Sequence, residues 1–310
     1  MPSPIDLLKL ARPKQWAKSA FVLIGPLYAL ADPAQKVEPG RVLLPAALAA
    51  IAFALVSSAC YIVNDVVDVE ADRRHPRKQR RPIASGRVSV RAALAFASVL
   101  AVLGLAAAAA IALENRPAAA WTTGILTVYA LNVVLYSLVI KRMVIADVMS
   151  LSAGFGLRVL GGCAAASVTP STWLLNCTLF FAMFLAFGKR LGERRTVEDA
   201  SLVRAVQSKY TDELLRMTTV VTGVALLVTY AGYVQSRHDA FLRPLPGLEA
   251  GFNLLWLTML PATYGLLRII VLLERGIYDD PTEVASKDLP IQLAGIGFIV
   301  LTVAAWWWCR

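Results

Sequence analysis

Nine long apolar runs constrain this chain more than any other feature of its sequence. Each run is about as long as the 20 residues that a helix needs to cross the hydrocarbon core of a membrane. The strict alternation that marks a transmembrane β-barrel is not found in them. We therefore predict an all-α integral membrane protein with nine transmembrane helices. The runs lie near residues 15–31, 41–63, 92–113, 119–140, 143–165, 171–188, 215–236, 252–273 and 289–308.

The composition agrees with a membrane protein. Hydrophobic residues make up 57% of the 310, and the mean hydropathy of +0.61 is high for a soluble domain. No short-period repeat or low-complexity linker separates the apolar runs. We therefore expect one domain, spanning residues 1–310.

The basic residues predict how the chain is oriented in the membrane. If the N-terminus is inside, the inner segments hold 24 of the 31 Lys and Arg residues and the outer segments hold six. This asymmetry follows the positive-inside rule and predicts an N-in, C-out protein of the inner (cytoplasmic) membrane. The bases lie between apolar spans rather than on one soluble face. The net charge is +10. We expect these bases to interact with the lipid bilayer and with an anionic substrate, and we expect no nucleic-acid partner.

A charged stretch, YIVNDVVDVEADRRHPRKQRRPIASG (61–86), directly follows the second apolar run. If the second helix continues through it, Asp65, Asp68 and Asp72 are spaced i, i+3, i+7 and share one face. Three neighbouring carboxylates repel one another, and Mg²⁺ suits them because it takes oxygen ligands and shares its coordination shell with substrate phosphates. The bases that follow, including Arg77, Lys78 and Arg81, could hold a polyanion. The alternative is an ordinary inner loop whose acids pair with neighbouring bases.

The pattern N-D-x-x-D-x-x-x-D, which begins at Asn64, resembles the first aspartate motif of the UbiA superfamily of intramembrane prenyltransferases. The resemblance implies nine transmembrane helices around a central cavity open to the cytoplasmic side. It also implies that Asp65, Asp68 and Asp72 are catalytic and hold Mg²⁺, which serves to ionise a diphosphate donor. The span count and the orientation agree with this family over most of the chain.

Five blocks in order narrow the resemblance to one branch of the superfamily, the polyprenyl-phosphate (decaprenyl-phosphate) phosphoribosyltransferases. That branch implies a Mg²⁺-dependent transferase that moves 5-phosphoribose from phosphoribosyl pyrophosphate to a polyprenyl (decaprenyl) phosphate and releases pyrophosphate. Its product is an arabinan precursor for cell wall biogenesis. It also implies a substrate-binding role for Tyr136. Lys18 and Lys141 are the candidates for binding the acceptor phosphate. The blocks are RPKQWAKS (12–19), NDVVDVEADRRHPRKQRRPIASG (64–86), YSLVIKRMVIADV (136–148), GFGLRVLGG (154–162) and FLAFGKRLGE (184–193).

The chain departs from typical members of the superfamily after the sixth helix. There a second D-x-x-x-D motif is usual, but this sequence reads FGKRLGERR, with Lys189, Arg190 and Glu193. Lys and Arg would hold phosphates directly, although Lys189 and Glu193 could simply pair at i, i+4. The alternative function is a UbiA-type prenyltransferase that moves a prenyl group from a prenyl diphosphate to an aromatic or other apolar acceptor. The basic motif argues against it, and the gathering of charge at the inner face argues against a transporter or channel.

Two charged residues fall inside the fifth apolar run. Asp147 and Arg158 are 11 residues apart, so they face the same way on a helix, roughly 16 Å apart along its axis. Charges inside a span are costly and usually face a cavity or a partner. Asp147 could join the metal site or pair with Lys141. Arg158 could bind the donor or tie helices together, and the glycines at 154, 156, 161 and 162 could allow close helix approach or leave room for a ligand. The sequence does not determine the oligomeric state, and a homo-oligomer is one of the alternatives.

Overall fold

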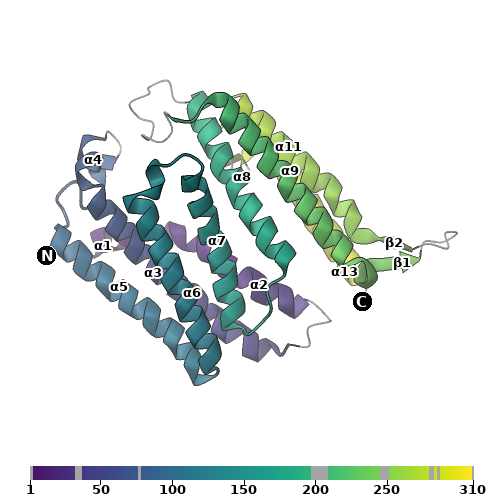
Figure 1. Ribbon diagram of the computed structural model, residues 1–310, viewed down its shortest axis with the longest axis horizontal. Coiled ribbons are helices and arrows are strands. Elements are labelled where there is room, and N and C mark those ends of the chain that lie inside the picture. The colour runs from purple at the N-terminus through teal and green to yellow at the C-terminus, as the bar shows by residue number, and fades with distance from the viewer. Residues whose placement is uncertain are drawn as a thin grey trace. The chain divides into compact units, whose positions relative to one another are not determined.

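Helices make up most of the part of the chain that the computed structural model describes. That part comprises residues 3–31, 37–75, 78–196, 209–244, 251–278, 283–284 and 287–308. The chain forms two compact units, Met1–Ser171 and Thr172–Arg310, and each is described here by itself. Figure 1 labels their elements.

Eight helices among the described residues are long and apolar enough to cross a membrane. They correspond to the second to ninth predicted runs and confirm the all-α membrane class. Two of them are lengthened by a 3-10 turn, η3 (Ile111–Leu113) after α5 and η7 (Leu254–Thr258) before α11. The helices are α3 (Pro39–Val67), α5 (Val90–Ala110), α6 (Arg116–Leu138), α7 (Ala146–Ala165), α8 (Thr172–Thr196), α9 (Asp212–Ser236), α11 (Met259–Glu274) and α13 (Leu289–Trp308).

The first predicted run has a different form. The chain begins with the short helix α1 (Pro4–Ala11), turns at Arg12 and continues as the 3-10 helix η1 (Pro13–Ser19) and then α2 (Ala20–Ala31). α1 ends here because a residue that precedes proline is disfavoured in the right-handed helical region. Arg12 itself adopts a left-handed conformation, with φ 51° and ψ 59°. Neither η1 nor α2 alone has the length of a span, so the ninth crossing stays a prediction.

In the first unit, α3 packs against α2, α5, α6 and α7. The core that they share includes Val22, Phe53, Leu126 and Tyr129. α2 also packs closely on α7. A Cβ atom at Gly162 would lie 1.7 Å from the carbonyl oxygen of Val22, so glycine is what permits this approach. This agrees with the predicted packing role of the glycines in this helix.

The segment after α3 differs from the continuous helix that the sequence suggested. α3 ends at Val67, Asp68 has φ −91° and ψ 6°, and a short helix α4 (Val69–Arg74) follows directly. Asp65 and Asp72 contact the same guanidinium, that of Arg81, so these two share a face as predicted, whereas Asp68 pairs with Lys141. The 3-10 turn η2 (Lys78–Arg80) then leads back to α5. The predicted tight hairpin between α6 and α7 is confirmed and contains the 3-10 turn η4 (Ile140–Arg142).

In the second unit, α8 packs against α9, and α11 packs against α13. Phe184, Leu266 and Leu273 belong to the buried core of this unit. After α9 a single turn, α10 (His238–Phe241), leads into an antiparallel pair of strands, β1 (Leu242–Pro244) and β2 (Gly251–Asn253). The sequence analysis did not predict this hairpin, because three-residue strands leave no readable alternation of apolar and polar residues.

Candidate active site

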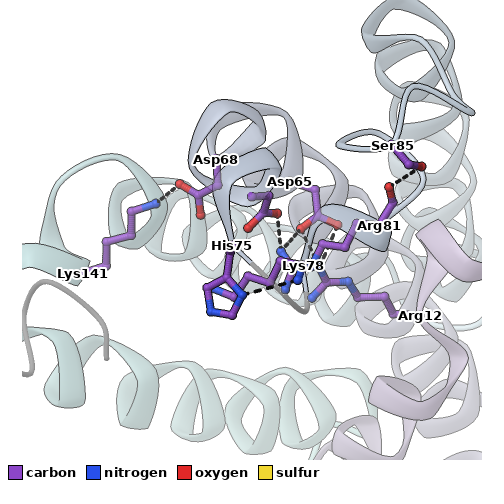
Figure 2. A network of polar contacts seen from close by, with 9 residues as sticks. Arg12, Asp65, Asp68, His75, Lys78, Arg81, Ser85 and Lys141 are labelled. Atoms are coloured by element: carbon purple, nitrogen blue, oxygen red, sulfur yellow. Dashed lines mark hydrogen bonds and ion pairs between the residues drawn. The ribbon is translucent and has the colours of Figure 1, made fainter. Parts of the chain in front are cut away.

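Two buried aspartates at the end of α3 and in α4 converge on one guanidinium. Nη1 of Arg81 lies 2.9 Å from Oδ1 of Asp65 and 2.6 Å from Oδ2 of Asp72. Asp65 also accepts hydrogen bonds from Nη2 of Arg12, at 2.5 Å to Oδ1 and 2.7 Å to Oδ2. Figure 2 shows Arg12 and Arg81 approaching Asp65 from two different segments of the chain. A positive charge therefore already bridges two of the three predicted metal ligands.

Asp68, the middle aspartate of the motif, has a separate partner. Oδ1 of Asp68 lies 2.5 Å from Nζ of Lys141, which η4 contributes from the α6–α7 hairpin. Figure 2 shows the Asp68–Lys141 pair apart from the pair of arginines. Lys141 reaches Asp68 across 73 positions of the chain.

Arg12 is a member of this cluster that the sequence analysis did not single out. It precedes Pro13, and its left-handed backbone conformation directs the chain back toward the end of α3. Its guanidinium also lies over the ring of Tyr61, 5.2 Å from the centroid. A residue other than glycine with this φ is uncommon and often marks a constrained site. The Arg-Pro pair that opens the RPKQWAKS block was the available signal.

A further ion pair flanks the cluster without belonging to it. Nε of Arg87 lies 3.0 Å from Oδ1 of Asp6 in α1. The hydrogen bond that the Ser3 hydroxyl donates, and then the charge of Arg87, hold the pKa of Asp6 below its usual value, against the opposing effect of burial. This pair fastens α1 to the loop that follows η2.

The three aspartates fit Mg²⁺ by the kind of ligand that they offer, since carboxylate oxygens are what this ion prefers. Their present arrangement does not form a finished metal site. The described residues contain no group of three or more His, Cys, Asp or Glu side chains gathered to hold a metal. The bridging nitrogen of Arg81 marks the point where a cation is already stabilised by two of these carboxylates.

Four other predicted site residues of the first unit differ in how far they are exposed. Asn64 is half-buried one residue before Asp65, and Lys78 is half-buried in η2. Tyr136 is half-buried near the end of α6, and Lys18 is exposed on η1. Arg77 lies outside the described residues.

The two charges inside α7 are both buried, as predicted, but they have different surroundings. Oδ1 of Asp147 accepts a hydrogen bond of 2.8 Å from the backbone of Val148, and Lys141 pairs with Asp68 instead of Asp147. Arg158 donates to hydroxyl oxygens from three other segments, at 2.6–3.1 Å. Within the part of the chain that the structure describes, this guanidinium contacts no carboxylate. The acceptors are Ser19 of η1, Ser57 of α3 and Tyr129 of α6.

Arg158 therefore joins four segments through hydrogen bonds, and Tyr129→Phe tests that role. The substitution keeps the ring and removes one acceptor from a buried cation, so we expect a loss of about 1.5–3 kcal/mol in the free energy of unfolding. The measurement is thermal unfolding of the purified protein in detergent. Tyr61→Phe is the matched control, since it removes the same atom from a neighbouring half-buried ring. Equal stability of the two variants would contradict this role.

The basic second motif lies on α8, in the second unit. Arg190 is buried, donates to the carbonyl oxygen of Ala186 at 2.9 Å and lies 5.8 Å from the ring centroid of Tyr210. Lys189 is exposed and Glu193 is half-buried on the same helix. Arg194, which the analysis had not singled out, pairs with Asp212 at 2.6 Å. This end of α8 therefore presents a group of cations where acids were expected from the family pattern.

Membrane-length helices and a cluster of acids and bases at the end of one of them define a polytopic integral membrane protein with a charged site. The sequence comparison makes this class specific: residues 20–286 match the UbiA prenyltransferase family, and the chain belongs to that family. A decaprenyl-phosphate phosphoribosyltransferase of Mycolicibacterium smegmatis is 33% identical, over 94% of this chain and 90% of the relative. The enzyme of the same name from Corynebacterium glutamicum is 32% identical, over 96% of this chain and 86% of the relative.

Solved structures agree with the fold. A UbiA homolog from Archaeoglobus fulgidus, bound to DMAPP and Mg²⁺, matches with a TM-score of 0.64 at 16% identity. The match covers 97% of this chain and 98% of that structure. The apo UbiA homolog from Aeropyrum pernix gives a TM-score of 0.63 at 16% identity, over 94% of this chain and 98% of that structure. The helical membrane fold is therefore that of the family.

Proposed function

We propose that this protein transfers 5-phosphoribose from phosphoribosyl pyrophosphate to a polyprenyl phosphate of the decaprenyl type and releases pyrophosphate. The observation that carries the proposal is the similarity, over nearly the whole chain, to two enzymes named for this transfer. The basic cluster supports it, because a donor with two phosphorylated ends and an anionic acceptor need several cations between them. A prenyltransferase with a neutral acceptor would not need them.

The residues of the first unit divide into two roles in this proposal. Asp65, Asp68 and Asp72 would hold Mg²⁺, which when bound stabilises the negative charge that develops on departing pyrophosphate. Arg81 and Arg12 would donate hydrogen bonds to pyrophosphate oxygens, because a guanidinium matches that geometry. Lys141, with Lys18, would orient the acceptor phosphate for attack on the anomeric carbon of the ribose. Since that phosphate is already anionic, no general base is required.

The basic motif on α8 would bind phosphate as well. We assign Lys189 and Arg190 to phosphate binding, with Glu193 holding their orientation through charge. Tyr136, Asn64, Arg77 and Lys78 would line the donor site from the first unit. Asp147 and Arg158 would support its floor within α7. One domain with nine crossings, N-in and C-out in the cytoplasmic membrane, would let a water-soluble donor meet a lipid acceptor in a central cavity open to the cytoplasm.

Transfer of radiolabel tests the proposal against its alternative. Purified protein with Mg²⁺, polyprenyl phosphate and phosphoribosyl pyrophosphate labelled in the ribose should yield label that extracts into organic solvent. We expect this rate to exceed prenyl transfer from a labelled prenyl diphosphate to an apolar acceptor by at least about 10²-fold, the cost of leaving buried polar groups unpaired. Label that stays in the aqueous phase, with active prenyl transfer, would replace the proposal with the prenyltransferase.

A further inference from the structure

Every aspartate of the motif already has a cation as its partner. Asp65 is paired with Arg12 and Arg81, Asp72 with Arg81, and Asp68 with Lys141. Three carboxylates are thus matched by three cations, and the charges of the cluster balance one another (Figure 2). Binding of a divalent cation alone would therefore leave an excess of two positive charges in a half-buried site.

The acids and the cations of the cluster differ in how firmly they are held. The side chains of Asp65 and Asp72 are each 4% exposed, whereas those of Arg12, Arg81 and Lys141 are 25%, 30% and 21% exposed, and that of Asp68 is 30% exposed. Asp65 and Asp72 therefore cannot turn to solvent without unpacking helices. The cations have flexible stems and water on one side, so they can change partner while their backbone stays in place.

The cations also come from short segments rather than from the membrane-length helices. Arg12 lies at the bend between α1 and η1, Arg81 follows η2, and Lys141 lies in η4. Three independent segments thus approach the end of α3, and each contributes one cation.

We propose that Arg12, Arg81 and Lys141 are exchangeable counter-ions that make the metal and the donor bind as a pair. This proposal rests on the proposed function. It adds a physical reason why the site would distinguish the free metal ion from the metal ion bound to the polyphosphate donor. Release of the cations from the aspartates is favourable only when the anionic oxygens of the donor accept them. Donor and metal then each raise the affinity of the site for the other by the same factor, because binding linkage is reciprocal.

Titration of the full-length protein in detergent with Mn²⁺ alone tests this proposal. Arg81→Gln should bind Mn²⁺ about 5–150-fold more tightly than the wild type, the usual range for coupled sites. In excess Mg²⁺ the same variant should bind phosphoribosyl pyrophosphate more weakly. Adding Asp65→Asn to Arg81→Gln should remove the gained Mn²⁺ binding and so assign it to this cluster. Lys141→Gln, which frees Asp68, provides a second variant with the same expected pair of opposite shifts.

Arg87→Gln is the matched control, because it removes an equal charge from the same loop but from a guanidinium that pairs with Asp6. Its Mn²⁺ affinity should remain within about twofold of the wild type, as surface charges act weakly at a distance. The proposal is overturned if Arg81→Gln and Lys141→Gln bind Mn²⁺ no more tightly than the wild type. An equal gain in Arg87→Gln would also overturn it. Because these titrations need no turnover, they fail or succeed separately from the labelled transfer that tests the function.

Discussion

Asp65→Asn is expected to lower phosphoribosyl transfer by at least about 10³-fold, at the upper end of the losses seen when one charge-stabilising group is removed. Asp65 is the residue on which the cluster converges, since it pairs with both Arg12 and Arg81. Asparagine keeps the size of the side chain but replaces a carboxylate oxygen with an amide nitrogen. It offers no negative charge to a metal, and its amide group faces two guanidinium groups that also donate.

The measurement is the initial rate of label transfer at saturating Mg²⁺ and donor, with the folded fraction checked by size-exclusion chromatography. Glu70→Gln is the control, since Glu70 pairs with Arg73, three residues further along the chain, and both side chains are exposed. That variant should retain a rate within about twofold of the wild type. A folded Asp65→Asn protein with a rate within tenfold of the wild type would remove Asp65 from the catalytic machinery.

The sequence predicted the membrane class because its signal is local. Each apolar run from 41–63 onward corresponds to a helix, since length and hydropathy alone decide whether a segment can span a membrane. The run at 15–31 does not form one regular α-helix, since its first residues lie in the 3-10 helix η1 and Pro26, inside α2, lacks a backbone donor. Apolar composition predicts that a segment is buried but does not say whether its helix is regular.

The candidate site could be predicted only as far as spacing along the chain allows. The motif identified Asp65, Asp68 and Asp72, and the bases that follow identified Arg81. Their partners could not be predicted, since Asp65 and Asp72 both contact Arg81 whereas Asp68 contacts Lys141, 73 positions away along the chain. Arg12 approaches Asp65 across 53 positions, and no local pattern encodes such a contact.

Arg158 illustrates the same limit inside the membrane. Its burial followed from its place in an apolar run, but the sequence left open whether it binds the donor or ties helices together. The structure gives it hydroxyls of Ser19, Ser57 and Tyr129 as partners, from three segments that the fold brings together. Serine in an apolar run is ordinarily satisfied by the carbonyl four residues before it, as Ser57 is by Phe53, so its second role was hidden.

Gly162→Ala is expected to be the most destabilising single-methyl substitution in the first unit. The added Cβ would lie 1.7 Å from the carbonyl oxygen and 2.7 Å from the carbonyl carbon of Val22. Because these are backbone atoms, no side-chain rotation relieves the clash and α2 must move away from α7. We expect a loss of about 3 kcal/mol or more in the free energy of unfolding, at the upper end for overpacked cores.

Gly156→Ala supplies the comparison on the same helix, since its Cβ would meet nothing within 4 Å. There alanine should be neutral or stabilise α7 by up to about 1 kcal/mol, through its higher helix propensity. Thermal unfolding in detergent should therefore separate the two variants, with the midpoint for Gly162→Ala lower by about 6–12 °C. Because the movement of α2 would also shift η1 and with it Arg12, this variant should lose transfer activity at temperatures where it is still folded. Equal midpoints for the two variants would mean that α2 and α7 pack less closely than the structure shows, and that Arg12 does not depend on this contact for its place beside Asp65.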